Sequence, residues 1–185
     1  MQEYRRHSRA LFAAIIIGII LLGTTTFAAV ATTQDQTTKQ ALTPLQLEIE
    51  QQRLRLNSAE IEDRREALMR LRSLHHAAAS RVALSALNDP AAIVRATAAA
   101  AVLSLPPDES ARSLIPLLTD KEEFVRQHVA YALGQTRSHA AVAPLSDRLT
   151  DKKDSVRGAA AVALGEIADA TAVTSLAAVL NPQSD

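Results

Sequence analysis

The segment DKEEFVRQHVAYALGQT, residues 120–136, returns 31 residues later as DKKDSVRGAAAVALGEI, residues 151–167. The two copies align Asp with Asp, Val-Arg with Val-Arg and Leu-Gly with Leu-Gly. A weaker copy in the same register, DPAAIVRATAAAAVLSL, begins at Asp89. Periods of roughly 20–50 residues are typical of solenoid proteins. The pattern therefore predicts a repeated scaffold and not a chemical motif used twice.

The same register aligns further residues in columns. The charged columns are Arg64, Arg95, Arg126 and Arg157, and Asp89, Asp120 and Asp151, with Ser58 at the Asp position of the first copy. The apolar columns between these blocks are Ala83, Leu114, Leu145 and Leu176, and Leu87, Leu118, Leu149 and Leu180. Apolar columns in two parts of each period predict two helices per repeat.

Within one period the two helices can be placed. In residues 120–136 the apolar positions from Val125 to Leu133 follow helical spacing, and Asp120 stands where it could cap the N-terminus. Gly134 falls in the last turn, where a missing side chain permits either a close helix approach or a stop. Residues 140–150 predict the second helix. Neither helix can bury its apolar stripe alone, so successive pairs must stack.

The composition predicts a core of small aliphatic side chains. The chain of 185 residues is 48% hydrophobic but only 3% aromatic. Residues 1–31 hold three of the 20 basic residues and one of the 20 acidic ones, which leaves 17 against 19 in residues 32–185. A nearly neutral body argues against nucleic acid as a partner, because its capture needs a basic face. Cysteine is absent, which excludes disulfides and thiolate metal sites.

The N-terminus predicts export from a bacterial cytoplasm. A basic flank precedes the uncharged apolar run of residues 10–23, and Ala29-Val30-Ala31 has the small residues of a peptidase site. We expect a signal peptide over residues 1–31 and a flexible linker over residues 32–43. The alternative is an uncleaved membrane anchor, because residues 10–31 carry no charge and are long enough to span a bilayer. The body is expected in the periplasm, either free or anchored to the inner membrane.

The residues Asp120, Val125-Arg126 and Ala132-Leu133-Gly134, with their copies, resemble the HEAT repeat. They resemble most closely the short HEAT-like repeats of phycobilisome lyase-type proteins, whose period is about 30 residues. The resemblance covers residues 44–181 and leaves a short tail, 182–185. It implies an all-α fold, an α-solenoid of about four helix pairs in a HEAT-like superhelix. The architecture by itself implies no activity.

The resemblance also implies roles for the charged columns. In HEAT-like stacks the Asp and Arg residues form a ladder that joins each repeat to its neighbour. We carry that structural role onto Asp89, Asp120, Asp151, Arg64, Arg95, Arg126 and Arg157. Because Arg64 faces Ser58 in its own copy, the sequence supports its rung less strongly than the other rungs. The alternative is that these charges bind an anionic ligand.

No catalytic residue, cofactor or metal site is expected, and the protein is predicted not to be an enzyme. The histidines of the body, His75-His76, His128 and His139, have no recognisable metal-ligand spacing. No G-x-S-x-G elbow or phosphate-binding glycine loop occurs. The resemblance leaves two enzymatic alternatives: a bilin lyase or isomerase, and an enzyme of similar fold that acts on nucleic-acid bases. The second would need a basic groove, which the charge count does not offer.

The aromatic residues predict a binding surface. Between residues 32 and 185, Phe124 and Tyr131 are the only Phe, Tyr or Trp residues, and with His128 and Gln135 they form one helical stripe. The resemblance places this helix on the concave side of the stack. We expect the stripe to bind another protein, since aromatic anchors dominate interfaces. The alternative is that Phe124 fills a gap between helices.

The two ends of the body are expected to differ. Residues 44–58 predict a first, capping helix, with a short coiled-coil segment as the alternative, whereas residues 170–181 supply one helix of a pair without its partner. Val173, Leu176 and Leu180 would then stay partly exposed and could mediate self-association. The sequence therefore predicts a non-catalytic adaptor that binds another, unidentified protein.

Overall fold

The structure, a computed structural model, describes residues 42–180, and the side chains of residues 42–177. The chain divides into two compact units between Thr43 and Pro44, and the second unit is the one described here. The expectations for residues 1–31, for most of the linker and for the tail lie outside the described residues. Among residues 42–180, no helix is long and apolar enough to cross a membrane.

Every regular element among the described residues is helical. The α-helices are α2 (Pro44–Arg55), α3 (Ile61–Ser73), α4 (Ala77–Ala83), α5 (Ala92–Ala101), α6 (Pro107–Leu114), α7 (Glu123–Thr136), α8 (Val142–Arg148), α9 (Asp154–Ile167) and α10 (Ala172–Leu180). Three short 3₁₀ segments extend α4, α6 and α8: Leu84–Asn88, Ile115–Thr119 and His139–Ala141. The prediction of an all-α stack of about four helix pairs is confirmed for this part of the chain.

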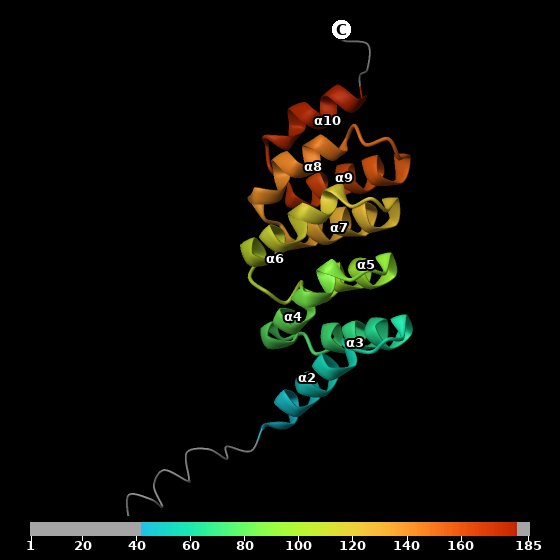
Figure 1. Ribbon diagram of the computed structural model, residues 1–185. Helices are drawn as coiled ribbons and strands as arrows, with labels where there is room; N and C mark the ends of the chain where they lie inside the picture. Colours follow the sequence, from blue (N-terminus) through green and yellow to red (C-terminus); the bar gives the residue numbers. More distant parts are fainter. Residues whose placement is uncertain (1–41, 181–185) are drawn as a thin grey trace, which may run out of the picture. The chain divides into compact units, whose positions relative to one another are not determined.

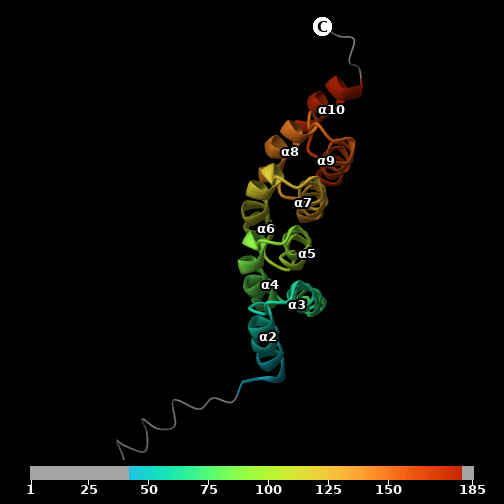
Figure 2. The same ribbon diagram turned by 45° about the vertical axis from the view of Figure 1, so that its right-hand side comes forward.

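The helices form two parallel rows within the unit. Figure 1 shows α2, α4, α6, α8 and α10 in one row and α3, α5, α7 and α9 in the other. In Figure 2 the first row bows outward, so α3, α5, α7 and α9 line the concave side. Each helix of this inner row packs on the next one, because alanine and glycine allow their backbones to approach closely.

The core is aliphatic, as the composition predicts. The buried apolar side chains of the described residues are all Ala, Leu, Val or Ile. The two apolar columns lie within this core: Leu114 and Leu145 are fully buried, and Leu118 and Leu149 almost so. At the C-terminal end Leu176 is only partly buried and Val173 is 62% exposed. The last repeat is therefore covered less well than the interior ones.

The start of α7 differs from the prediction. Asp120 does not cap the helix: the N-cap residue is Glu122, which makes no capping side-chain bond. Instead, Asp120 Oδ1 accepts a hydrogen bond from the Glu122 backbone N–H at 2.9 Å, in a turn that precedes the helix. Asp89 and Asp151 accept equivalent bonds two residues ahead of them. The acidic column thus shapes the turns that precede α5, α7 and α9.

Gly134 serves close approach and not termination. The helix α7 continues for two residues beyond it and ends at Arg137, which adopts a left-handed conformation with φ 53°. A Cβ on Gly134 would lie 2.8 Å from Ala163 Cα in α9 and 2.5 Å from Glu166 Oε2. The missing side chain is therefore what allows α7 and α9 to pack at this distance.

Candidate protein-binding surface

The predicted stripe lies on the exposed face of α7. Phe124, His128, Tyr131 and Gln135 are all exposed, with 42% of Phe124 and 38% of Tyr131 accessible. The Phe124 and His128 rings contact each other, with centroids 4.0 Å apart and planes tilted by 47°. The His128 Nδ1 atom lies 2.8 Å from the Phe124 carbonyl oxygen, which fixes the imidazole beside the phenyl ring. An exposure of 42% does not fit the alternative that Phe124 fills a gap between helices.

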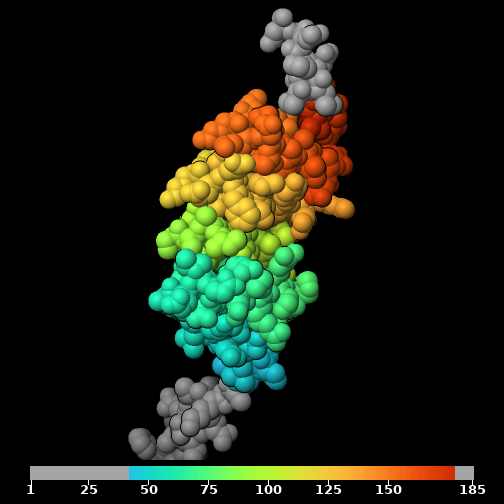
Figure 3. Space-filling model, turned by 90° about the vertical axis from the view of Figure 1, so that its right-hand side faces the viewer, coloured from blue at the N-terminus to red at the C-terminus, as the bar shows by residue number. Residues whose placement is uncertain are grey.

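Residues one period away extend the stripe along the inner row. Tyr131 aligns with Met69 in α3 and Val162 in α9, which are 43% and 50% exposed. Phe124 aligns with Ile93 in α5, which is 38% exposed. We call these five side chains the inner apolar strip. Figure 3 shows the molecule from the side of α3, α5, α7 and α9, the helices that carry this strip.

Sequence reasoning identified only the α7 part of this strip. Met69 and Val162 were not predicted, because the prediction rested on aromatic side chains and these two residues are not aromatic. They can be identified from a sequence column at 31-residue spacing. This column holds a large apolar residue in three of four repeats: Met69, Ala100, Tyr131 and Val162. Their exposure could not be predicted from the pattern, because buried columns are apolar too.

The charged columns form a ladder between neighbouring repeats. Each rung pairs an arginine with the aspartate that follows it by 25 residues, Nε with Oδ2 and Nη2 with Oδ1, at 2.7–3.0 Å: Arg64 with Asp89, Arg95 with Asp120, and Arg126 with Asp151. In the Arg126–Asp151 rung both side chains are only 6% exposed. Bidentate pairs of this kind fix both distance and orientation.

Arg64 forms a regular rung with Asp89, although Ser58 occupies the Asp position of its own repeat. An aligned register suggests that an arginine faces the Asp of its own repeat, but the guanidinium reaches the Asp of the next one. From its own repeat it needs only a backbone carbonyl: Arg64 Nη1 donates to the Ser58 carbonyl at 3.0 Å, as Arg126 Nη1 does to that of Asp120 at 2.9 Å. Ser58 therefore does not weaken the first rung.

The last arginine of the column stands apart. Arg157 Nη1 still donates to the Asp151 carbonyl, at 2.8 Å. Its Nη2 pairs with Asp154 in its own helix, and these side chains are 39% and 92% exposed. Among the described residues no aspartate takes the position of the next rung. The ladder therefore ends at Asp151.

The rungs keep their aspartates ionised. Hydrogen bonds from Arg126 hold the pKa of Asp151 below its usual value, against the effect of burial. For Asp89 and Asp120, burial opposes ionisation most strongly, but the bonds from Arg64 and Arg95 and from the backbone outweigh it and also lower the pKa. The ladder is therefore a set of charged pairs at neutral pH.

Two histidines outside the stripe, His76 and His139, have local structural roles. His76 Nδ1 accepts the backbone N–H of Ala78 at 3.1 Å and so caps α4. His139 pairs with Asp169 of the next repeat, and hydrogen bonds from Thr171 and His139 lower the pKa of Asp169 to about 2. In the part of the chain that the structure describes, no three His, Cys, Asp or Glu residues are grouped closely enough to hold a metal ion.

Comparisons with known proteins agree with this geometry. The family described as HEAT repeats matches residues 80–165 and 111–185. The chain is similar to the crystal structure of an engineered protein, with a TM-score of 0.53 and 22% identity over 75% of this chain and 73% of that one. A chain from a structure on TOG–tubulin binding specificity in microtubule dynamics matches with a TM-score of 0.48 and 16% identity, over 70% of this chain and 65% of that one. No curated protein matches.

Proposed function

Because the chain belongs to the HEAT repeat family, we propose that it is a non-catalytic adaptor that binds another protein through the concave side of its solenoid. Stacked repeats of this kind create extended concave surfaces that suit protein ligands. The observation that carries the proposal is the inner apolar strip. Met69, Ile93, Phe124, Tyr131 and Val162 expose large apolar surfaces on helices of one row.

The strip has the composition of an interface centre. Aromatic and methionine side chains are enriched in interfaces, and residues that dominate binding cluster near the middle of a patch. The two aromatic residues lie on α7, with α3 and α5 on one side of it and α9 on the other. A partner that covers α7 would therefore also reach Ile93 and Val162.

Site-specific crosslinking tests the proposal. A photoreactive phenylalanine analogue is placed at Tyr131, at Val162 or, as a control, at Leu54, which is 66% exposed on α2 in the outer row. We expect one shared adduct from Tyr131 and Val162 in the native cell and none of that mass from Leu54. The variant Tyr131→Ala should weaken capture of that partner by about tenfold or more, with an unchanged melting temperature. A lower melting temperature with full capture would instead assign Tyr131 to packing.

The proposal includes export. The support is the sequence of residues 1–31, with its basic flank, apolar run and Ala29-Val30-Ala31 end. Either a released periplasmic protein or one anchored by residues 10–31 would present the solenoid outside the cytoplasm. Mass spectrometry of the protein from its native cell separates the two, because cleavage after Ala31 removes 31 residues. Recovery of the whole chain in the soluble cytoplasmic fraction would contradict both.

Two further expectations stay open to direct tests. The bilin lyase alternative predicts that the protein binds a tetrapyrrole, which an absorbance titration detects. Self-association through α10 predicts a dimer that dissociates in the variant Val173→Asp, because Val173 is 62% exposed and a carboxylate there opposes apolar contact. Analytical ultracentrifugation measures that equilibrium.

A further inference from the structure

Arg148 interrupts an apolar column. One and two periods earlier the same position holds Leu117 and Ala86, which are buried to 9% and 6% exposure. Arg148 occupies it at the end of α8, with its side chain partly buried. A guanidinium at a packing position loses hydration without filling the space as an apolar side chain does. Its presence therefore needs a compensating interaction.

The guanidinium is only half bonded. Arg148 Nη1 donates to the Leu118 carbonyl at 3.3 Å. Its Nε atom is buried and has no hydrogen-bond partner. Among the described residues no acceptor is found for its Nη2 atom either. The edge formed by Nε and Nη2 is the one that binds both oxygens of a carboxylate.

The ladder arginines show how this arrangement is completed. In Arg95 and Arg126, Nη1 donates to backbone carbonyls while Nε and Nη2 hold both oxygens of an aspartate. Arg148 has the carbonyl contact without the carboxylate. It resembles a rung from which the acidic partner is missing.

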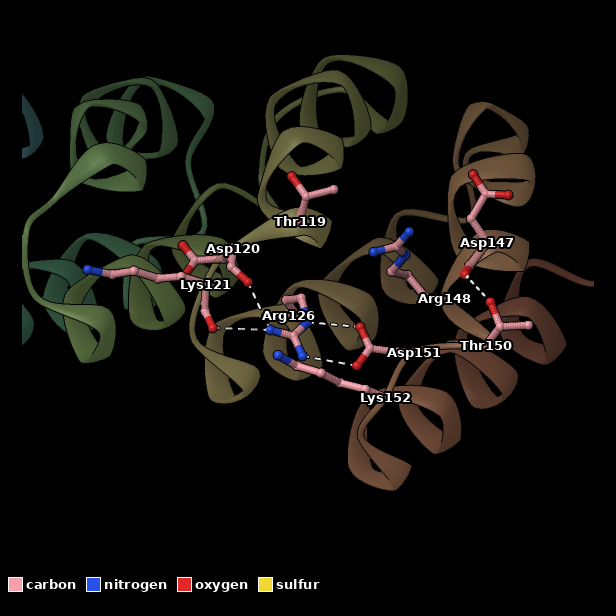
Figure 4. A pocket seen from close by; sticks show the side chains of 9 residues that line it. All are labelled: Thr119, Asp120, Lys121, Arg126, Asp147, Arg148, Thr150, Asp151 and Lys152. Carbon is pink, nitrogen blue, oxygen red and sulfur yellow. Dashed lines mark hydrogen bonds and ion pairs between the residues drawn. The ribbon is translucent and has the colours of Figure 1, made fainter.

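The nearby carboxylates are already bonded. Asp151 Oδ2 accepts from Arg126 Nε, and its Oδ1 accepts from Arg126 Nη2 and from the Lys153 backbone N–H. Asp120 is held in the same way by Arg95 and by the Glu122 N–H. Figure 4 shows the Asp147 carboxylate turned away from the Arg148 guanidinium, which points into a pocket of about 400 Å³.

The pocket walls add positive charge. Once the rungs are neutralised within themselves, Lys121, Arg148 and Lys152 remain, with Asp147 as the opposing charge. The Lys121 charge acts on Asp120 and the Arg148 charge acts on Asp151, whose carboxylate is bonded to Arg126. The Lys152 ammonium has no ion-pair partner within residues 42–177. The equivalent groove one repeat earlier has Pro116 and Leu117 in place of Asp147 and Arg148. The cationic character thus belongs to this groove and not to the repeat in general.

We propose that this pocket binds a carboxylate side chain of an acidic peptide, held by Nε and Nη2 of Arg148 and attracted by Lys152. A carboxylate fits better than a phosphate, because it matches the partner that the same fork has in the ladder. None of these residues belongs to the inner apolar strip, so this site and the proposed adaptor surface can fail independently.

The test is an NMR titration of the arginine Nε–Hε signals of the full-length protein. The probes are the blocked tripeptides acetyl-Ala-Glu-Ala-amide, its Gln counterpart and its phosphoserine counterpart. We expect the Glu peptide to shift one Nε–Hε signal to saturation and the Gln peptide to bind at least about tenfold more weakly. The signal that moves should be the one that is lost in Arg148→Leu, which installs the residue of the preceding repeat.

Matched variants test the role of Arg148 in binding. Arg148→Leu should weaken the Glu peptide by about tenfold or more, whereas Arg72→Leu, at an exposed arginine of α3, should stay within about twofold. If Arg148→Leu does not fold, Lys152→Ala should still weaken binding by about threefold. Equal affinity for the Glu and Gln peptides, an equal loss in Arg72→Leu, or tighter binding of the phosphoserine peptide would overturn the proposal.

Discussion

Helices α7 and α9 carry two copies of one motif but differ in what lies beside them. In α7, Arg126 is almost fully buried and holds Asp151 of the next repeat, and Gly134 lies against Ala163. In α9, Arg157 is 39% exposed and pairs within its own helix. In the described part of the chain, no atom other than the backbone of α9 itself lies within 4 Å of the Cβ position of Gly165. The contacts of a motif residue, and hence its role, therefore depend on the repeat that follows it. Stability in such a stack comes from interfaces between neighbours.

Acid should have the largest effect, because it acts on every rung together. The pKa values of Asp89, Asp120 and Asp151 are lowered from the ordinary value of 3.8. A lowered pKa in the folded state stabilises the protein above that ordinary value, and the stabilisation is lost as the pH falls through the lower, folded pKa. We therefore expect constant stability from neutral pH to about pH 5 and a steep loss below about pH 4.

The melting temperature measured from pH 7 to pH 3 checks this expectation. The variant Asp151→Asn should be less stable at pH 7 and should lose less on acidification, because one titrating rung is gone. Parallel pH curves for the variant and the wild type would mean that the ladder does not govern the acid transition.

Removal of the interior arginine should be the most damaging single change. Arg126→Ala leaves the Asp151 carboxylate buried and unpaired, which costs about 3–5 kcal/mol. The matched variant Arg157→Ala removes the same motif residue where it is solvated, and should cost less than about 1 kcal/mol. Urea unfolding followed by circular dichroism measures both. Equal losses would show that Arg157 has a partner beyond the described residues.

The repeat register predicted the helices, the aliphatic core and the ladder residues, because positions one period apart have equivalent surroundings inside the stack. It did not predict which repeat a side chain reaches. The partner of Arg64 is Asp89 and not residue 58, because the long arginine side chain reaches the turn that begins the next repeat. Nor did it predict the turn formed by Asp120, because spacing alone does not distinguish a helix cap from a turn two residues earlier.

Two features of the candidate sites could not be predicted from the sequence. Arg148 stands in the same sequence column as Leu117, but only the structure shows a buried Nε without a partner. Met69 and Val162 look like core residues in the sequence, and only their exposure assigns them to the strip with Tyr131. In each case the register gives the position, and the packing around it decides the role.

A side chain on the interior glycine should have a moderate cost. In Gly134→Ala the new Cβ would lie 2.8 Å from Ala163 Cα. The Glu166 carboxylate nearby can rotate away, but the α9 backbone has to shift. Overpacking of this kind costs about 1–3 kcal/mol, less any gain in helix propensity. A variant as stable as the wild type in urea would show that α7 and α9 separate easily.

The same change at the terminal glycine should have the opposite sign. In Gly165→Ala the added methyl group meets no described residue outside the backbone of α9 within 4 Å. Because alanine is favoured over glycine in a helix, we expect a gain of about 0.5–1 kcal/mol. Urea unfolding of Gly165→Ala beside Gly134→Ala measures the pair. Opposite signs would mean that Gly134 is needed for the packing of α9 on α7, whereas Gly165 has no such neighbour among the described helices. A loss at Gly165 would mean that this face of α9 is covered in solution, because only a packed surface can make an added methyl group unfavourable there.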